Sequence, residues 1–94
     1  MFSISTDARG NVLLAGRFDA SQTDQARQFF DRISDSATVD FVALDYISSA
    51  GLGVLLATQQ RLKKDGKALK LIHMNPLIRD VFRIARFDLI FHIE

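Results

Sequence analysis

Residues 39–66 read VDFVALDYISSAGLGVLLATQQRLKKDG, and this stretch determines the fold. The run from Val39 to Leu44 is β-branched and aromatic with one polar interruption, which is typical of a central strand covered on at least one face. Lys63 to Gly66 would end a following helix, with cations at the negative end of its dipole and a glycine suited to a left-handed cap. The apolar residues between them recur at helical spacing: Leu52, Leu55, Leu56 and Leu62, widened by Val54 and Ala57.

The residues before this stretch predict a hairpin and a first helix. Phe2 to Thr6 alternate between apolar and polar, and the turn residues Asp7 to Asn11 separate them from an apolar run that begins at Val12. Gly16 to Asp19 ends the second strand, and Ser21 to Asp24 resembles a capping box with Asp in place of the usual Glu. The apolar residues that follow at helical spacing are Ala26, Phe29, Phe30 and Ile33.

The residues after the stretch predict a strand, a helix and a last strand. Residues 67–73 form an apolar strand pattern, and Asn75-Pro76 is a strong helix start because Asn can cap and Pro suits the first helical position. Phe87 to Ile93 predicts the last strand. A hairpin followed by strand–helix alternation predicts an α/β fold: a mixed sheet of about five strands with helices packed on it. No linker or repeat divides the sequence, so we expect one domain over residues 1–94.

The composition excludes several classes of function. Twelve basic and eleven acidic residues leave a net charge of +1, which gives no general reason to bind nucleic acid or an anionic membrane. The absence of Cys excludes thiol catalysis, and His73 and His92 are too few for a His-rich metal centre. No apolar run is long enough to span a membrane, and Met1 leads directly into the first strand pattern without a signal peptide. We therefore expect a cytoplasmic protein without metal or cofactor.

Two adjacent hydroxyls, Ser48 and Ser49, mark the start of the second predicted helix. A phosphate there, carrying about −1.5 to −2 charges, would lie beside free backbone N–H groups and the positive end of the helix dipole. Either serine could instead be a simple N-cap worth about 1 kcal/mol, and the pattern alone favours that interpretation. Enzyme motifs are incomplete: Gly51 and Gly53 lack the third glycine of a dinucleotide fingerprint, and Ile47 replaces the first glycine of a nucleophile elbow.

The stretch Asp45 to Leu56 resembles the signature of STAS domains, the bacterial anti-sigma factor antagonists. That signature is an aliphatic strand, a short loop, a pair of small polar residues and Gly-Leu-x-x-Leu opening a helix. Gly16 to Asp19 is similar to the end of the family's second strand, and Asn75-Pro76, with Val81-Phe82 and Phe87, to its third-helix region. The resemblance covers most of the chain and implies a STAS-type fold.

The resemblance also implies a function without enzyme activity. In that family an anti-sigma factor, which is also a serine kinase using ATP, phosphorylates one serine of the loop. The unphosphorylated domain binds the kinase and releases its sigma factor, and a metal-dependent serine phosphatase reverses the modification. Alignment on Gly51 to Gly53 places the phosphorylated serine at Ser49, with Ser48 as the alternative site and as the helix cap. Ser48 stands where one branch of the family has Asp, and Ala50 where it often has Ser.

The partner-binding surface implied by the resemblance comprises Asp19, Ser48, Ser49, Ala50, Gly51 and Leu52. Asp19 has a second interpretation, as a helix cap with Ser21. An alternative function is a non-phosphorylated STAS scaffold subunit of a transporter or larger signalling complex. We expect a monomer, with a homodimer as the alternative.

Three further features concern the arginines near the third predicted helix, the two histidines and the C-terminal segment. The arginines Arg79, Arg83 and Arg86 form either a partner-facing stripe or a solvated face balanced by Asp80 and Asp88. The two histidines are expected to be structural. Many STAS domains carry a further helix after the last strand. We expect either a minimal domain or a surface around Phe87 to Phe91 that is covered by a partner or a second copy.

Overall fold

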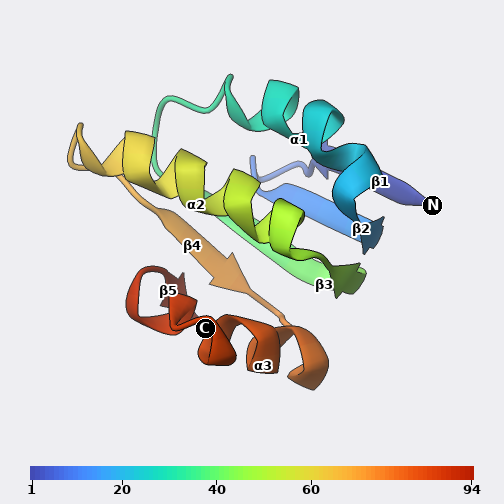
Figure 1. Cartoon of the computed structure of the whole chain (residues 1–94). Helices are drawn as coiled ribbons and strands as arrows, with labels where there is room; N and C mark the ends of the chain where they lie inside the picture. Colours follow the sequence, from blue (N-terminus) through green and yellow to red (C-terminus); the bar gives the residue numbers. More distant parts are fainter.

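The computed structural model describes residues 1–94 and arranges five strands in one sheet (Figure 1). The strands, in spatial as well as chain order, are β1 (Phe2–Thr6), β2 (Val12–Phe18), β3 (Ala37–Ile47), β4 (Leu69–Ile72) and β5 (His92–Ile93). β1 and β2 form the antiparallel hairpin, and the other neighbouring pairs are parallel. The predicted mixed sheet of five strands is confirmed.

Three helices join the parallel strands, and two 3-10 turns complete the chain. They are α1 (Thr23–Phe30), α2 (Ser49–Lys63) and α3 (Pro76–Ile84), with η1 (Ala20–Gln22) before α1 and η2 (Phe87–Leu89) after α3. Each helix connects strands that are neighbours in a monotonic order, so right-handed crossovers place all three on the same face of the sheet. Figure 1 shows α1 and α2 side by side over that face, and α3 contacts β3 and η2.

One apolar core lies between this face and the helices. Its centre includes Phe18 and Phe30, both fully buried, and Phe41 of β3 meets Phe82 of α3 edge to face with ring centroids 5.9 Å apart. The side chains that alternate with the core residues point to the other face, which no helix covers. They include Ser3, Ser5, Leu13, Ala15, Thr38, Asp40 and Lys70. One face of the sheet is therefore structural and the other is open.

The prediction of a last strand from Phe87 to Ile93 is wrong for most of its length. Arg86 adopts a left-handed conformation (φ 64°), η2 follows, and only His92–Ile93 pairs with β4. The reason is tertiary packing: the rings of Phe87 and Phe91 both turn onto Phe82, with centroids 6.3 and 5.8 Å away. Part of the surface between residues 87 and 91 is thus covered by the chain's own α3.

Two boundaries near the loop after β3 also differ from expectation. β3 does not end at Leu44 but continues to Ile47, because the end of β2 pairs with it, Arg17 opposite Tyr46 and Phe18 opposite Ile47. The capping box predicted at Ser21 to Asp24 forms two residues earlier, with Asp19 as the N-cap of η1. The longer β3 extends the edge of the sheet from which α2 starts, and η1 follows β2 directly after Asp19.

A buried glutamine on α2 escaped the sequence analysis. The predicted apolar stripe included Ala57 and Leu56, yet Ala57 is exposed and Leu56 half-buried, while Gln59 is 2% exposed. The Gln59 side chain accepts a hydrogen bond from Leu69 N (2.8 Å) and donates one to Ile90 O (3.0 Å). It therefore ties α2 to β4 and to the segment before β5. No helix of the protein is long and apolar enough to cross a membrane.

Candidate functional site

The candidate site lies where β2 and β3 end and α2 begins. Phe18 pairs with Ile47 at the last position of the parallel ladder, and Ser48 N donates a hydrogen bond to Phe18 O at 2.9 Å. The next residues, Asp19 and Ser48, therefore leave the sheet side by side at its carboxyl edge. Loops at this edge of an α/β sheet commonly carry function because their side chains converge there.

Ser48 is the N-cap of α2, as the sequence predicts. Its backbone is extended (φ −86°, ψ 168°), and its Oγ accepts a hydrogen bond from Gly51 N at 3.1 Å. Its carbonyl accepts the first helical hydrogen bond, from Leu52 N at 2.9 Å. The Ser48 hydroxyl thus satisfies one of the free donors of the helix start and already has a structural role.

Ser49, the first helical residue, differs from Ser48 because its hydroxyl caps nothing. It is exposed, and its hydroxyl takes part in no hydrogen bond within the chain. Ser49 and Ala50 lie in the first turn, where backbone N–H groups have no acceptor inside the helix and the dipole is positive. A group with negative charge on Ser49 Oγ would therefore lie beside unpaired donors at little cost to the fold.

Glycine at position 51 permits the close approach of α2 to the ends of β2 and β3. A Cβ there would lie 3.0 Å from Ile47 Cγ1 and 3.1 Å from Phe18 Cγ, tighter than ordinary packing. Leu52 beside it is 6% exposed and belongs to the core. Of the six predicted partner-binding residues, Gly51 and Leu52 therefore lie beneath the surface, while Ser49 is exposed and the other three are half-buried.

Asp19 has the capping role that the sequence left open. Its Oδ1 accepts hydrogen bonds from Ser21 Oγ (2.6 Å) and Ser21 N (3.0 Å), and its N–H bonds to Gln22 Oε1 (2.9 Å). These bonds from Ser21, aided by the nearby charge of Arg17, lower the pKa of Asp19 below its ordinary value of 3.8. The carboxylate is thus ionised at neutral pH, at the same edge as the serines.

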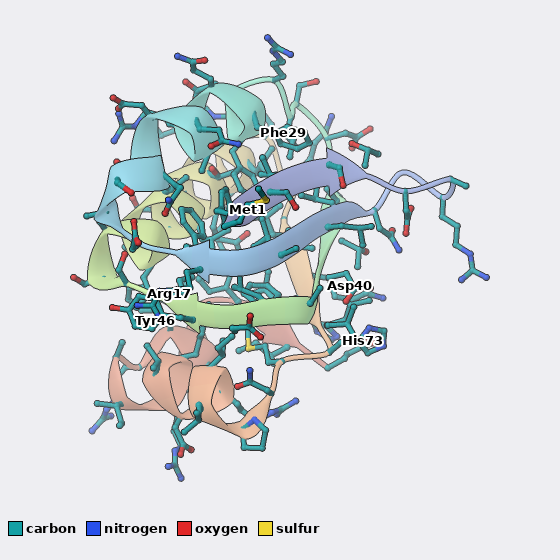
Figure 2. The ribbon with its side chains drawn as sticks, turned by 90° about the vertical axis from the view of Figure 1, so that its right-hand side faces the viewer. Met1, Arg17, Phe29, Asp40, Tyr46 and His73 are labelled. Carbon is teal, nitrogen blue, oxygen red and sulfur yellow. The ribbon has the colours of Figure 1, made fainter.

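Arg17 and Tyr46 stand on the open face of the sheet at the same end of the strands (Figure 2). The Arg17 guanidinium carbon lies 4.2 Å from the centre of the Tyr46 ring, a cation–π contact that holds both side chains across the strand pair. Tyr46 keeps 38% of its surface exposed. The carboxyl edge therefore carries a cation and an aromatic ring on one side, and the two serines at the start of α2 on the other.

A shallow groove of about 410 Å³ runs between α1 and α2. On the α2 side its wall includes the small residues Ala50, Gly53 and Ala57 together with Arg61, and on the α1 side it includes Thr23 and Arg27. Ala50, the residue after Ser49, is part of this lining, whereas Ser49 itself is not.

No group of three or more potential metal ligands gathers anywhere in the protein. The two histidines form separate carboxylate pairs away from the serines: His73 Nδ1 lies 3.0 Å from Asp40 Oδ1, and His92 Nε2 lies 2.9 Å from Glu94 Oε2. Figure 2 shows the His73–Asp40 pair at the opposite end of β3 from Arg17 and Tyr46. The arginines of α3 are exposed, and Arg83 pairs with Asp80 at 2.8 Å.

Known proteins resemble this chain in sequence. A family model described as "Mlab, STAS domain" matches residues 3–92. The protein BtrV of Bordetella bronchiseptica, which carries the name anti-sigma factor antagonist, is 38% identical over 63 residues, 67% of this chain and 54% of that protein. The chain therefore spans about half the length of BtrV. A STAS-domain containing protein of Pseudomonas aeruginosa is 25% identical over 88% of this chain and 85% of its own.

Solved structures agree in fold at lower identity. An anti-sigma factor antagonist from Thermotoga maritima superposes with a TM-score of 0.81 at 18% identity, covering 99% of this chain and 85% of that one. The Bacillus cell fate determinant SpoIIAA in its phosphorylated form gives 0.70 at 19% identity, over 100% and 91% of the two chains. The family match over nearly the whole sequence and the shared fold together establish that the chain belongs to the STAS domain family.

Proposed function

We propose that this domain is an anti-sigma factor antagonist whose binding to an anti-sigma factor is switched by phosphorylation of Ser49. One observation carries the assignment of the serine: the Ser48 hydroxyl is bonded to Gly51 N, whereas the adjacent Ser49 hydroxyl is exposed and unbonded. A kinase can reach the second hydroxyl without breaking a cap. The name carried by BtrV supports the class of partner.

The modification would be an ordinary phosphoryl transfer. Ser49 Oγ bonds to the γ-phosphorus of ATP, the bond from that phosphorus to the β,γ-bridging oxygen breaks, ADP leaves, and the hydroxyl proton passes to the kinase. A metal-dependent phosphatase would return the hydroxyl by hydrolysis. This chain contributes the acceptor oxygen and its placement, and the kinase contributes the catalytic groups.

The site has a physical reason to switch binding without unfolding. The new charge of about −1.5 to −2 would be stabilised by the free N–H groups of the first turn of α2. It would also join Asp19, already ionised at the same edge, and make that edge more negative. A partner with a carboxylate or an apolar side chain facing Ser49 would be repelled or left with a desolvated dianion.

The unphosphorylated edge is suited to close contact. Ser49 and Ala50 are small, and Gly53, one turn along α2, is exposed with open space around it. A partner surface can thus approach the helix backbone and place a side chain in the groove beside it. Because the partner would approach these small residues closely, a phosphate on Ser49 would obstruct its contact with the start of α2.

Phosphate mapping tests this proposal. The purified domain is incubated with ATP and a serine kinase of the anti-sigma factor class, and the product is examined by intact-mass and peptide mass spectrometry. We expect one phosphate on the wild type and on Ser48→Ala, and none on Ser49→Ala. Phosphate on Ser48 in the intact domain would contradict the assignment. A stable complex with a transporter component that Ser49→Asp leaves undisturbed would favour the scaffold function instead.

A further inference from the structure

The outer edge of β1 is a row of backbone groups that no element of the chain pairs. The hydrogen bonds Asp7 N to Asn11 O and Arg17 N to Met1 O show that the odd-numbered residues of this segment bond toward β2. In an antiparallel ladder the bonded positions alternate, so the N–H and C=O groups of Phe2, Ile4 and Thr6 point away from the sheet. None of the hydrogen bonds outside the regular ladder involves these three residues.

This edge lacks the features that usually prevent pairing between strands. β1 reads FSIST, without a charge, a proline or a bulge along its five residues. The opposite edge of the sheet is different, because β5 has only two residues and is flanked by the His92–Glu94 pair. β1 is therefore the edge available to a further strand.

A groove accompanies the free edge on the helix side of the sheet. A depression of about 240 Å³ lies between Ile4 and a stripe of α1, which consists of Gln25, Gln28, Phe29 and Arg32. Ile4 and Phe29 are half-buried and pack on the core, so their outer surfaces form the apolar floor. A strand added to β1 would place alternate side chains in this groove.

We propose that the occupant is β1 of a second copy of this chain, paired antiparallel about a two-fold axis at Ile4. In that register Phe2 lies opposite Thr6 of the second copy, Ile4 opposite its own counterpart, and the outward backbone groups of both strands meet. The side chain of Ile4 fills the groove of the other copy. The two sheets become one continuous sheet.

The outward positions of β1 are symmetric about Ile4, so the edge is self-complementary, and charge does not oppose a second copy as the partner. The paired strands carry no charge, so nothing repels when two identical edges meet. The only charge in the α1 stripe is Arg32, at one end of it. A two-fold axis makes the two α1 helices antiparallel, which places the two Arg32 side chains at opposite ends of the interface.

The dimer leaves the candidate site free. β1 is separated from β3 by β2, and Ser49 lies beyond the end of β3, so each copy keeps its own serine exposed. The proposal does not depend on phosphorylation or on an anti-sigma factor. It adds that two such sites would be presented by one particle.

Disulfide cross-linking tests the register, because the chain has no cysteine of its own. Ser3 and Ser5 are exposed on the open face, and in the proposed dimer Ser3 lies opposite Ser5 of the second copy in a non-bonded pair, with Cα atoms about 4.5 Å apart. That distance permits a disulfide, whereas Ser3 and its own counterpart would be about 7–8 Å apart and outside the usual range. Oxidation of mixed Ser3→Cys and Ser5→Cys proteins should give mainly the mixed dimer. Equal amounts of mixed and same-variant products would overturn the register.

Sedimentation equilibrium tests the dimer itself. Thr6→Pro removes an outward N–H and no hydrogen bond of the hairpin, so it should weaken the dimer about tenfold or more while the fold remains. Thr6→Ala is the matched control, since it loses the side chain and keeps the N–H. Wild-type protein that is monomeric up to its solubility limit overturns the proposal. A dimer that is insensitive to Thr6→Pro also overturns it. So does slow amide hydrogen exchange at the β1 edge that requires an added extended peptide and is not seen with the protein alone.

Discussion

Ser48 Oγ accepts a hydrogen bond from Gly51 N at 3.1 Å and so closes the first turn of α2. The next hydroxyl along the chain, that of Ser49, is exposed and has no such bond. Of these two neighbouring serines, Ser48 therefore has a structural role, whereas the Ser49 hydroxyl is free to be modified. The division follows from backbone position alone, because only the N-cap residue directs its side chain at the free donors of the helix.

The two serines should differ in their effect on stability. Ser48→Ala removes the cap and should lower the free energy of unfolding by about 1 kcal/mol. Ser49→Ala removes a free hydroxyl at the surface and should change it by less than about 0.5 kcal/mol. Urea denaturation of both variants against wild type measures the difference. Equal losses would show that Ser48 is not the effective cap.

The two glycines of α2 should respond oppositely to alanine. At Gly51 the new methyl would lie 3.0 Å from Ile47 Cγ1 and press on the Phe18 ring, so Gly51→Ala should destabilise by about 1–3 kcal/mol. Gly53 has no atom within 4 Å of that position and is exposed inside the helix, so Gly53→Ala should stabilise by about 0.5–1 kcal/mol. Thermal unfolding of the pair provides the comparison, and stabilisation of both would contradict the packing described for Gly51.

Gln59 should be among the most sensitive polar positions. Gln59→Leu leaves buried Leu69 N without its partner, at a cost of about 1–3 kcal/mol, and also removes the bond to the half-buried Ile90 O. Its neighbour Gln60 is exposed, and Gln60→Leu should change the free energy of unfolding by less than about 0.5 kcal/mol. Chemical denaturation tests both variants. Similar stabilities would show that the two hydrogen bonds of Gln59 contribute little.

Asp19 should contribute a stability that depends on its charge. Its folded pKa is lowered below 3.8 by the hydrogen bonds from Ser21, so its contribution is present above the unfolded pKa and is lost as pH falls through the lower folded pKa. Asp19→Asn keeps a capping side chain without the charge. The variant should be less stable than wild type near pH 7, and the difference should shrink as the pH falls below 3.8. Denaturation curves at neutral and acidic pH measure it, and a pH-independent difference would contradict the role of the charge.

Much of the fold could be predicted because local signals agreed with the tertiary structure. Asn75 caps α3 through its Oδ1 and Ile78 N (2.9 Å), with Pro76 at the first helical position, as the sequence indicates. Gly66 adopts the predicted left-handed conformation after α2 (φ 73°). Ser48 also takes its predicted place as the cap. In each case the residue type acts on its own backbone, so short-range chemistry is enough.

The errors occurred where distant contacts outweigh local pattern. The apolar run from Phe87 reads as a strand, but Phe87 and Phe91 gain more by packing on Phe82, which lies on another element. No sequence pattern marks Gln59 as buried, because its hydrogen-bond partners come from β4 and from the segment before β5. Buried Gly51 and exposed Ser49 are only two residues apart in the motif. The packing of α2 on Phe18 decides which of them is buried and which remains accessible.

The affinity of the cognate anti-sigma factor for the domain, measured by calorimetry with and without stoichiometric phosphate on Ser49, tests the central claim most directly. We expect the unmodified domain and Ser49→Ala to bind alike, and the phosphorylated domain to bind at least about 100-fold more weakly, as expected when a dianion is placed in a contact surface. Circular dichroism of both forms should be the same, because the phosphate lies at a helix start that tolerates it. Equal affinity of the phosphorylated and unmodified domains would contradict the claim that Ser49 is the switch.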